Sequence, residues 1–184
     1  YGNYLEADIS EVTAALTSLV KPRVDDLPAL AVTNLDQDKR QQLTQTLKHD
    51  DAVISWYIQG NDRSVRQQAL FALTGQALKS GFFQQLRTEQ QLGYIASAFS
   101  WPQNRVPGLV MIIQSPSHSS LDVRDAIAQF LQDVPNDIDE AAFHRHRQAL
   151  VAEINEPFKN LWERAEFLWQ SLGEGDQSFA SKQE

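Results

Sequence analysis

A helical pattern gives way to a strand pattern within the nine residues LRTEQQLGY, positions 86–94. Upstream, apolar residues recur at helical spacing from Val65 onward, which predicts a long amphipathic helix that ends near Arg87. Downstream, residues 93–101 alternate between large and small side chains, as a strand does when its two faces meet different surroundings. The stretch therefore predicts a short corner between a helix and a strand.

The strand after this corner has two unlike faces. Alternation places Ile95, Phe99 and Trp101 on one apolar face. It places Tyr94 on the other face, together with the small residues Ala96, Ala98 and Ser100. In one interpretation the phenol and the small residues line the floor of a groove. In the other, which the pattern alone favours, the small residues let a helix pack closely and Tyr94 fills its edge.

Further strands and helices are predicted on both sides of the corner. Residues 52–59 are rich in β-branched and aromatic side chains, and with residues 41–48 they predict a hairpin around an acidic turn. Residues 108–115 are apolar on both faces, which is typical of a central strand. Additional helices are predicted before Pro22, around residues 123–131, between Asp137 and Pro157, and from Phe158 to Gly173. Grouped strands and grouped helices favour an α+β fold, an antiparallel β-sheet backed by helices.

The composition is that of an ordinary globular protein. The 184 residues are 42% hydrophobic and 22% charged, enough for one full-sized domain, or a domain with a fragment of another. The net charge is −8 and the basic residues are scattered, so neither nucleic acid nor an anionic membrane surface is an expected partner. The absence of cysteine excludes disulfides, thiolate catalysis and cysteine-based zinc sites. No apolar run reaches the roughly 20 residues that span a bilayer.

The sequence contains no recognisable set of catalytic or metal-binding residues. His144 and His146 are two positions apart on a predicted helix, so their side chains diverge by about 200°. Neither the H-E-x-x-H nor the H-x-x-E-H motif occurs. Ser119 is better explained as a helix cap, with Asp122 three residues on, than as a nucleophile beside a histidine. Acidic pairs such as the one at 50–51 fall in turns, where solvation is the default.

Three segments resemble one protein family. Residues 83–95, FQQLRTEQQLGYI, resemble the hallmark of the C-terminal half of insulinase/pitrilysin-type (inverzincin) zinc metallopeptidases. The segments GLVMIIQS at 108–115 and FHRHRQAL at 143–150 match the same region in order. By this resemblance, residues 1–24 are the terminal helix of the family's third domain. Residues 25–184 are its fourth, inactive peptidase-like α+β domain without its final elements.

The resemblance implies that the parent protein is a zinc metalloendopeptidase. In that family, two halves close around a peptide chamber and the N-terminal half holds the zinc. The present chain would then bind no metal and be inactive alone, and its partners would be peptide substrates and the N-terminal half of the same parent chain. The resemblance also implies that Arg87 and Tyr94 contact the substrate near the scissile bond. A guanidinium and a phenol can donate hydrogen bonds to a peptide carbonyl or to its oxyanion.

Two other functions stay open at this point. The chain could be a structural or assembly domain of a catalytically inactive family member, or a peptide-binding module that acts alone. Arg87 and Tyr94 favour the peptidase, because a scaffold needs no hydrogen-bond donors in a chamber wall. The resemblance to bacterial pitrilysins favours the bacterial periplasm or the cytoplasm as the location of the parent protein.

Overall fold

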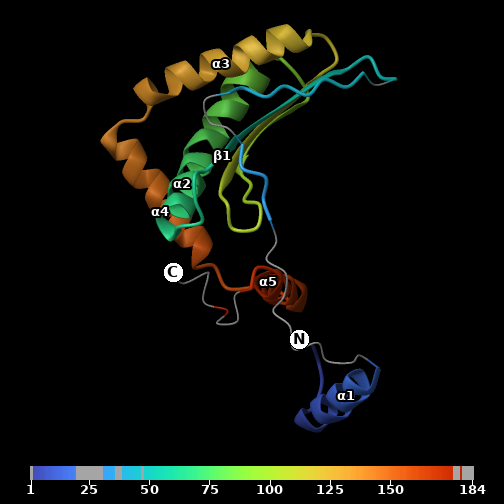
Figure 1. The fold of residues 1–184 in the computed structure, drawn as a ribbon. Coiled ribbons are helices and arrows are strands. Elements are labelled where there is room, and N and C mark those ends of the chain that lie inside the picture. Colours follow the sequence, from blue (N-terminus) through green and yellow to red (C-terminus); the bar gives the residue numbers. More distant parts are fainter. Residues whose placement is uncertain (1, 20–30, 36–38, 47, 176–178, 180–184) are drawn as a thin grey trace. The chain divides into compact units, whose positions relative to one another are not determined.

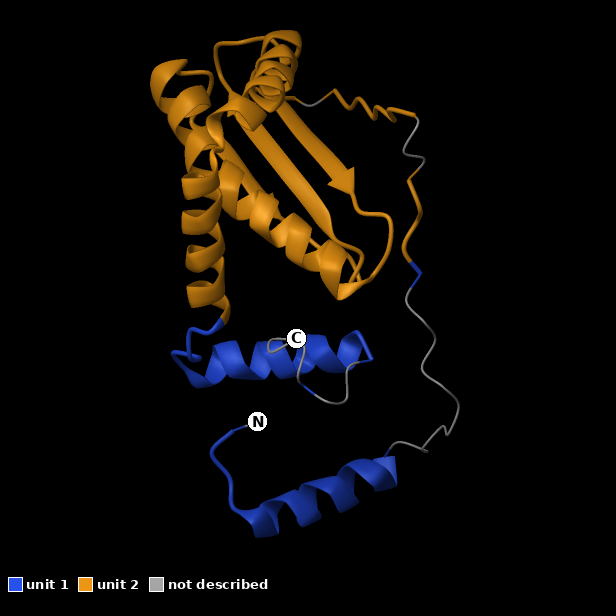
Figure 2. Cartoon of the chain, turned by 90° about the vertical axis from the view of Figure 1, so that its left-hand side faces the viewer, with its two compact units in different colours: residues 1–31, 155–184 blue, residues 32–154 orange. Residues whose placement is uncertain are grey.

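The computed structural model describes residues 2–19, 31–35, 39–46, 48–175 and 179 (Figure 1). The chain divides into two compact units, one of residues 32–154 and one of residues 1–31 with 155–184 (Figure 2). The predicted domain boundary between residues 24 and 25 lies outside the described residues. None of the helices in the described ranges has the length and the apolar composition that crossing a membrane requires.

The larger unit is built on a three-stranded antiparallel sheet. The strands are β1 (Ala52–Gln59), β2 (Ile95–Ser100) and β3 (Gly108–Ser115), in the order β1-β3-β2. β3 pairs along its whole length with β1, from Ala52 opposite Ser115 to Gln59 opposite Gly108. The predicted central position of β3 is confirmed, and it explains why this strand is apolar on both faces.

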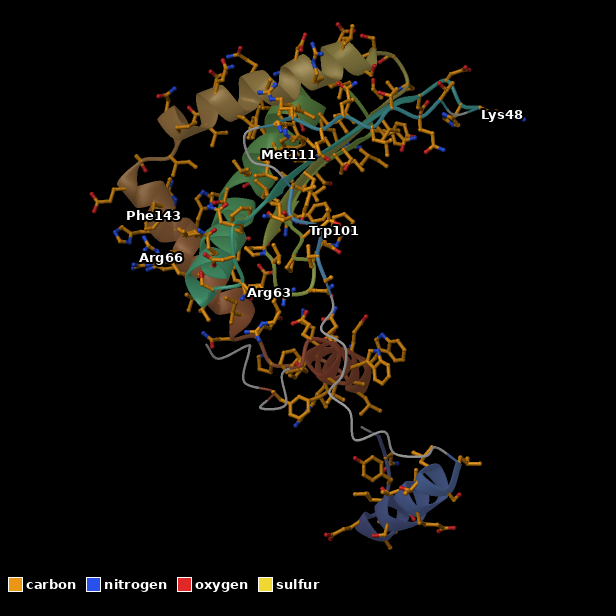
Figure 3. All side chains as sticks on the ribbon, in the orientation of Figure 1. Lys48, Arg63, Arg66, Trp101, Met111 and Phe143 are labelled. Atoms are coloured by element: carbon orange, nitrogen blue, oxygen red, sulfur yellow. The ribbon has the colours of Figure 1, made fainter. Side chains whose placement is uncertain are left out.

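Helices pack against one face of this sheet. They are α2 (Val65–Phe82), its π-helical continuation η1 (Phe83–Glu89) and α3 (Ser120–Asp137), while α4 (Glu140–Ile154) packs against α2. The hydrophobic core lies where α2, η1 and α3 meet the sheet, and it includes Leu78, Phe82, Leu86, Met111, Ile113, Val123, Ile127 and Phe130. The rings of Phe82 and Phe130 meet edge to face, with their centroids 5.2 Å apart. Figure 3 labels Met111 of β3, which is fully buried. The predicted α+β fold with an antiparallel sheet backed by helices is confirmed.

The predicted hairpin before β1 is wrong. Residues 39–46 form no strand, and β1 pairs with β3 instead of with the segment before it. The segment 41–46 is polar apart from Leu43, whose side chain is almost fully exposed. A strand is stabilised mainly by burying one of its faces, and β3 offers β1 an apolar neighbour that residues 41–46 lack.

Side chains cap the helices at positions that the sequence predicts only in part. The predicted cap at Ser119 is confirmed: its hydroxyl oxygen accepts the backbone N–H of Asp122, and the Asp122 carboxylate accepts the backbone N–H of Ser119 in return. The helix predicted from Asp137 onward begins later, as α4, and is capped by Asp139, whose carboxylate accepts the backbone N–H of Ala142 at 2.6 Å. Several acidic residues near the start of the helix have a spacing suitable for an N-cap, and the local sequence does not indicate which of them is the cap.

The smaller unit contributes two described helices, α1 (Glu6–Leu19) and α5 (Leu161–Gly173). No residue of α1 is buried. α5 is capped by Asn160, which accepts the backbone N–H of Glu163 at 2.9 Å. Its apolar residues border a hollow of about 500 Å³, and Trp162 and Trp169 are largely exposed there.

Candidate functional site

The corner between η1 and β2 is fixed by two buried leucines and one close backbone approach. Leu86 and Leu92 are both buried, and the backbone N–H of Leu92 donates to the carbonyl of Leu86 at 3.0 Å. Gln91 between them has a φ of 52°, a left-handed conformation that turns the chain. At Gly93 a Cβ atom would collide with the carbonyl oxygen of Gln114 in β3. Glycine is therefore required where the corner meets the sheet.

Arg87 is held at this corner by two contacts. Its guanidinium lies over the ring of Phe83, 5.0 Å from the centroid. Its Nε donates a hydrogen bond to the carbonyl oxygen of Tyr94 at 3.0 Å. The side chain is otherwise exposed, and neither of these contacts uses its two Nη groups as donors. The corner therefore holds the Arg87 guanidinium in a fixed position, with its Nη groups available as hydrogen-bond donors.

Tyr94 is held at its other end by a carboxylate. Its hydroxyl donates to Oδ2 of Asp51 at 2.6 Å, and Nε2 of Gln114 donates to the same oxygen at 2.8 Å. The bond from Tyr94, followed by that from Gln114, lowers the pKa of the Asp51 carboxyl. The same bond raises the pKa of the Tyr94 phenol, because it stabilises the protonated hydroxyl. Tyr94 is 48% exposed, whereas the Asp51 side chain is only 10% exposed.

His49 completes the surroundings of Asp51. The backbone N–H of Asp51 donates to Nδ1 of His49 at 3.1 Å, which requires Nδ1 to carry no proton. The same Nδ1 lies 3.5 Å from the other carboxylate oxygen of Asp51. His49 thus lies against both the backbone and the carboxylate of Asp51.

The structure decides between the two interpretations of the small residues in β2. Ala96 and Ala98 are 2% and 3% exposed and lie in the core. On α2, a Cβ atom at Gly75 would lie only 2.7 Å from the backbone nitrogen of Ser100, so the helix packs closely on the strand. The groove-floor interpretation is therefore wrong, and the close-packing interpretation holds for the small residues.

Tyr94 does not follow the predicted alternation. It precedes the first residue of β2, and its hydroxyl reaches Asp51, to which Gln114 also donates, instead of entering the core beside Ala96. Gln114 pairs with Ile95, and both belong to the sheet face that points away from the core. The left-handed residue Gln91 lies just upstream, so the period-two rule does not extend back from the strand to Tyr94.

The sheet face away from the core is apolar and open. Ile95 and Phe99 of β2 and Val53 of β1 are all exposed. Trp101, labelled in Figure 3, is half exposed and meets the ring of Tyr57 at 6.4 Å in an edge-on arrangement. Arg87 and Tyr94 thus lie at the end of a strand whose open face carries large apolar side chains.

Two residues of this site, Asp51 and Gln114, were not predicted from the sequence. From the sequence alone, the acidic pair at 50–51 is interpreted as part of a solvated turn. This interpretation agrees with the exposure of Asp50 but not with the nearly buried side chain of Asp51. The missing signal is the pairing of β1 with β3, which sets Asp51 one residue beyond the register that ends at Ala52 and Ser115. Local periodicity does not indicate that two strands 60 residues apart in the sequence pair with each other.

The histidines form no metal site in the described part of the chain. No group of three or more His, Cys, Asp or Glu side chains gathers there. His144 has a single acidic neighbour, Glu140, at 3.8 Å. His118 lies 3.1 Å from the hydroxyl of Ser117, its neighbour in the chain. Ser115 accepts both backbone N–H groups of that turn, which indicates a structural role for the cluster.

Comparisons with known proteins converge on one family. A family model described as PQQ synthase PqqF-like, C-terminal lobe domain 4, matches residues 73–169, more than half of the chain. Coenzyme PQQ synthesis protein F of Pseudomonas protegens is 32% identical over 118 residues, which are 62% of this chain and 14% of that protein. The A-factor-processing enzyme of Saccharomyces cerevisiae is 26% identical over 193 aligned residues, 100% of this chain and 19% of that enzyme. The insulin-degrading enzyme of Homo sapiens is 34% identical over 116 residues, 60% of this chain and 11% of that enzyme.

The same similarity is found at the level of the fold. The crystal structure of pitrilysin matches 74% of this chain with a TM-score of 0.64 and 22% sequence identity, over 15% of the pitrilysin chain. The chain spans between 11% and 19% of the length of the relatives named here. The chain belongs to the PqqF-like C-terminal lobe domain 4 family, in the C-terminal region of the insulinase/pitrilysin peptidases.

Proposed function

We propose that this chain forms part of the wall of a peptide-binding chamber in a zinc metalloendopeptidase, and that it positions the substrate near the scissile bond. The observation that carries the proposal is the constrained corner, where Arg87 and Tyr94 are held side by side at the end of an open apolar strand. Names of relatives such as insulin-degrading enzyme and A-factor-processing enzyme support peptides as the substrate class.

The corner has the chemistry that a peptide main chain requires. The Nη groups of Arg87 can donate to a peptide carbonyl, and the stacking of Arg87 on Phe83 limits the entropy lost when it does so. The open face beside it, with Ile95 and Phe99, can take up apolar side chains of an extended peptide. Donors that are fixed before the substrate arrives lower a reaction barrier more than mobile ones.

The zinc of the proposed parent enzyme would be held elsewhere in that protein. The described residues of this chain offer no cluster with the three or four donors that a zinc site needs. We assign the metal to the N-terminal half of the parent chain, and to the present chain a role in binding and orienting the substrate. Residues 1–24 would be the last helix of the preceding domain, and the parent protein a periplasmic or cytoplasmic bacterial enzyme.

The test is peptide hydrolysis by the full-length protein that carries this chain. Arg87→Ala is expected to lower kcat/KM by about tenfold to a hundredfold, with a rise in KM, because it removes a charged anchor for the substrate. The matched control is Arg66→Ala at the start of α2, an exposed arginine roughly 30 Å from Arg87 along the helix axis.

The control variant is expected to hydrolyse the peptide at the wild-type rate. Unchanged kinetics in Arg87→Ala and in Tyr94→Phe would contradict the proposed function. The alternative, a structural or assembly domain of an inactive family member, would then be preferred. A chain with that role would show lowered thermal stability in these variants without any effect on turnover.

A further inference from the structure

We propose that Asp51 is a positioning residue for Tyr94, and that it makes the Tyr94 oxygen a hydrogen-bond acceptor for a peptide N–H. The inference rests on the proposed function, because it specifies how the same corner meets its substrate. It differs from the role that the family resemblance implies, in which the phenol donates to a carbonyl or an oxyanion.

Tyr94 is clamped at both ends. Arg87 holds its carbonyl oxygen at 3.0 Å, and Asp51 holds its hydroxyl at 2.6 Å. Asp51 is itself oriented by the amide of Gln114 at 2.8 Å and by its own backbone bond to His49. The carboxylate is nearly enclosed, whereas the phenol is half exposed. An incoming group therefore meets the ring and its oxygen, with Asp51 behind them.

The single hydroxyl proton decides what the phenol can offer. A tyrosine hydroxyl carries one donor and two acceptor lone pairs. An ionised carboxylate can only accept, so the proton of the short bond belongs to Tyr94 and points at Asp51. The oxygen keeps acceptor capacity on its other side. A carbonyl or an oxyanion arriving there would have to displace the bond to Asp51 before it could receive the proton.

The charged groups around the phenol agree with this assignment. Arg87 lies on one side as a donor, and the carboxylate of Asp51, which also contacts His49, receives the hydroxyl proton on the other. An extended peptide presents C=O and N–H groups along the same edge. Arg87 can take the carbonyl and the Tyr94 oxygen can take the N–H, so the two residues complement the C=O and the N–H that one residue of an extended peptide presents on the same edge.

A double-mutant cycle in the full-length protein tests the positioning role. Asp51→Asn replaces the charged acceptor by a neutral one and weakens its hold on the Tyr94 proton, and it is expected to lower kcat/KM for a peptide substrate by about tenfold. In the Tyr94→Phe background the same change is expected to cost less than about twofold, since there is no hydroxyl left to position. Asp50→Asn, an equal change of charge at the exposed neighbouring residue, is the control and is expected to leave kcat/KM unchanged.

Peptides with single ester bonds test the acceptor role. Each peptide keeps its scissile amide, and one other N–H is replaced by an ester oxygen, which deletes a donor with little change of shape. An ester at one position of the peptide is expected to lower the kcat/KM of the wild-type protein about fivefold to tenfold. The same ester is expected to have no such effect on the Tyr94→Phe variant.

The outcomes separate the two proposals. If Asp51→Asn costs as much with Tyr94→Phe as without it, Asp51 acts on the fold and the positioning role is overturned. If every ester has the same effect with and without the hydroxyl, the acceptor role is overturned, while the proposed function still stands on the losses in Arg87→Ala and Tyr94→Phe. If those two variants hydrolyse peptide normally, the proposed function fails and the inference fails with it.

Discussion

Tyr94 differs from Tyr57, a tyrosine towards the opposite end of the sheet, in how its hydroxyl is satisfied. Its hydroxyl is bonded to Asp51 at the surface. The hydroxyl of Tyr57 is buried and has no hydrogen-bond partner among the described atoms, and its burial raises the pKa of that phenol. A tyrosine that is exposed and still held by a carboxylate is suited to binding, because its orientation is set before a ligand arrives.

Removing the Tyr94 hydroxyl is expected to impair turnover and to spare the fold. Tyr94→Phe should lower kcat/KM by between about tenfold and a thousandfold in the full-length protein, the range for a lost polar contact to the reacting substrate. The ring keeps its packing, and Asp51 keeps the amide of Gln114, so Tm should change by no more than a few degrees. Steady-state kinetics beside a thermal melt separate the two effects. A large fall in Tm with normal kinetics would assign Tyr94 to stability.

The hydrogen bonds of Asp51 make a pH-dependent contribution to stability. The pKa of Asp51 is lowered from 3.8, so its contribution is present above pH 3.8 and is lost as the pH falls through the depressed value. The pKa of Tyr94 is raised from 10.0, so its contribution is present below pH 10.0 and is lost as the pH rises through the elevated value. The pair therefore stabilises the fold across the whole neutral range.

Thermal melts from acid to neutral pH check this sign. The Tm of the wild type relative to Asp51→Asn is expected to rise as the pH increases from below the lowered pKa of Asp51 and to level off once the pH is above 3.8. Asp50→Asn, which makes the same change of charge, serves as the reference for general electrostatic effects. A difference between wild type and Asp51→Asn that is constant from acid to neutral pH would contradict the assignment.

At the scale of elements, what could be predicted depends on whether the signal is local. The bounds of β1 and β3 follow from their β-branched and apolar runs, and both are found as predicted. The hairpin before β1 was wrong because pairing is not a local property, and the apolar partner, β3, lies about 50 residues away. The residues of the corner were found because they form a contiguous motif. Asp51 was missed because only the β1–β3 register brings it to Tyr94.

Gly93 gives this corner a sharp mutational test. Gly93→Ala places a Cβ atom against the carbonyl oxygen of Gln114, which is backbone and cannot move aside without shifting β3. The expected loss of unfolding free energy is about 1–3 kcal/mol, as for other overpacked sites. Denaturant unfolding followed by circular dichroism measures it. Gly173→Ala on α5 is the control, because nothing lies within 4 Å of its Cβ position, and it should be neutral or slightly stabilising.

At the scale of the whole molecule, the apolar surface is divided unevenly. The larger unit buries its core between the sheet and the helices, and it leaves the opposite sheet face open. In the smaller unit, α1 buries no residue although it carries a regular apolar stripe of Ile9, Val12 and Leu16. The sequence predicts such stripes from their spacing, but it does not show what covers them. The sequence therefore predicts the fold of the chain better than it predicts what covers the exposed apolar faces of that fold.

The division of labour in the proposed parent enzyme leads to a prediction about zinc. Zinc sites in proteins need three or four nitrogen, oxygen or sulfur ligands about 2.0–2.3 Å from the metal. The described residues contain no cluster of three candidates, and the pairs His49 with Asp51 and His144 with Glu140 supply only two each. The present chain, loaded with equimolar zinc and dialysed, is expected to retain well under one zinc per chain by elemental analysis.

The full-length protein, treated in the same way, is expected to keep about one zinc and to lose peptide hydrolysis when a chelator removes it. A variant of the present chain with both His144 and His146 changed to alanine controls for weak surface binding, since these two are the closest pair of histidines in the sequence. Retention of one zinc by the wild-type chain, lost in that variant, would contradict the proposed division. A metal ligated by α4 would make the C-terminal region a zinc site in its own right, and Arg87 and Tyr94 would then need a different explanation.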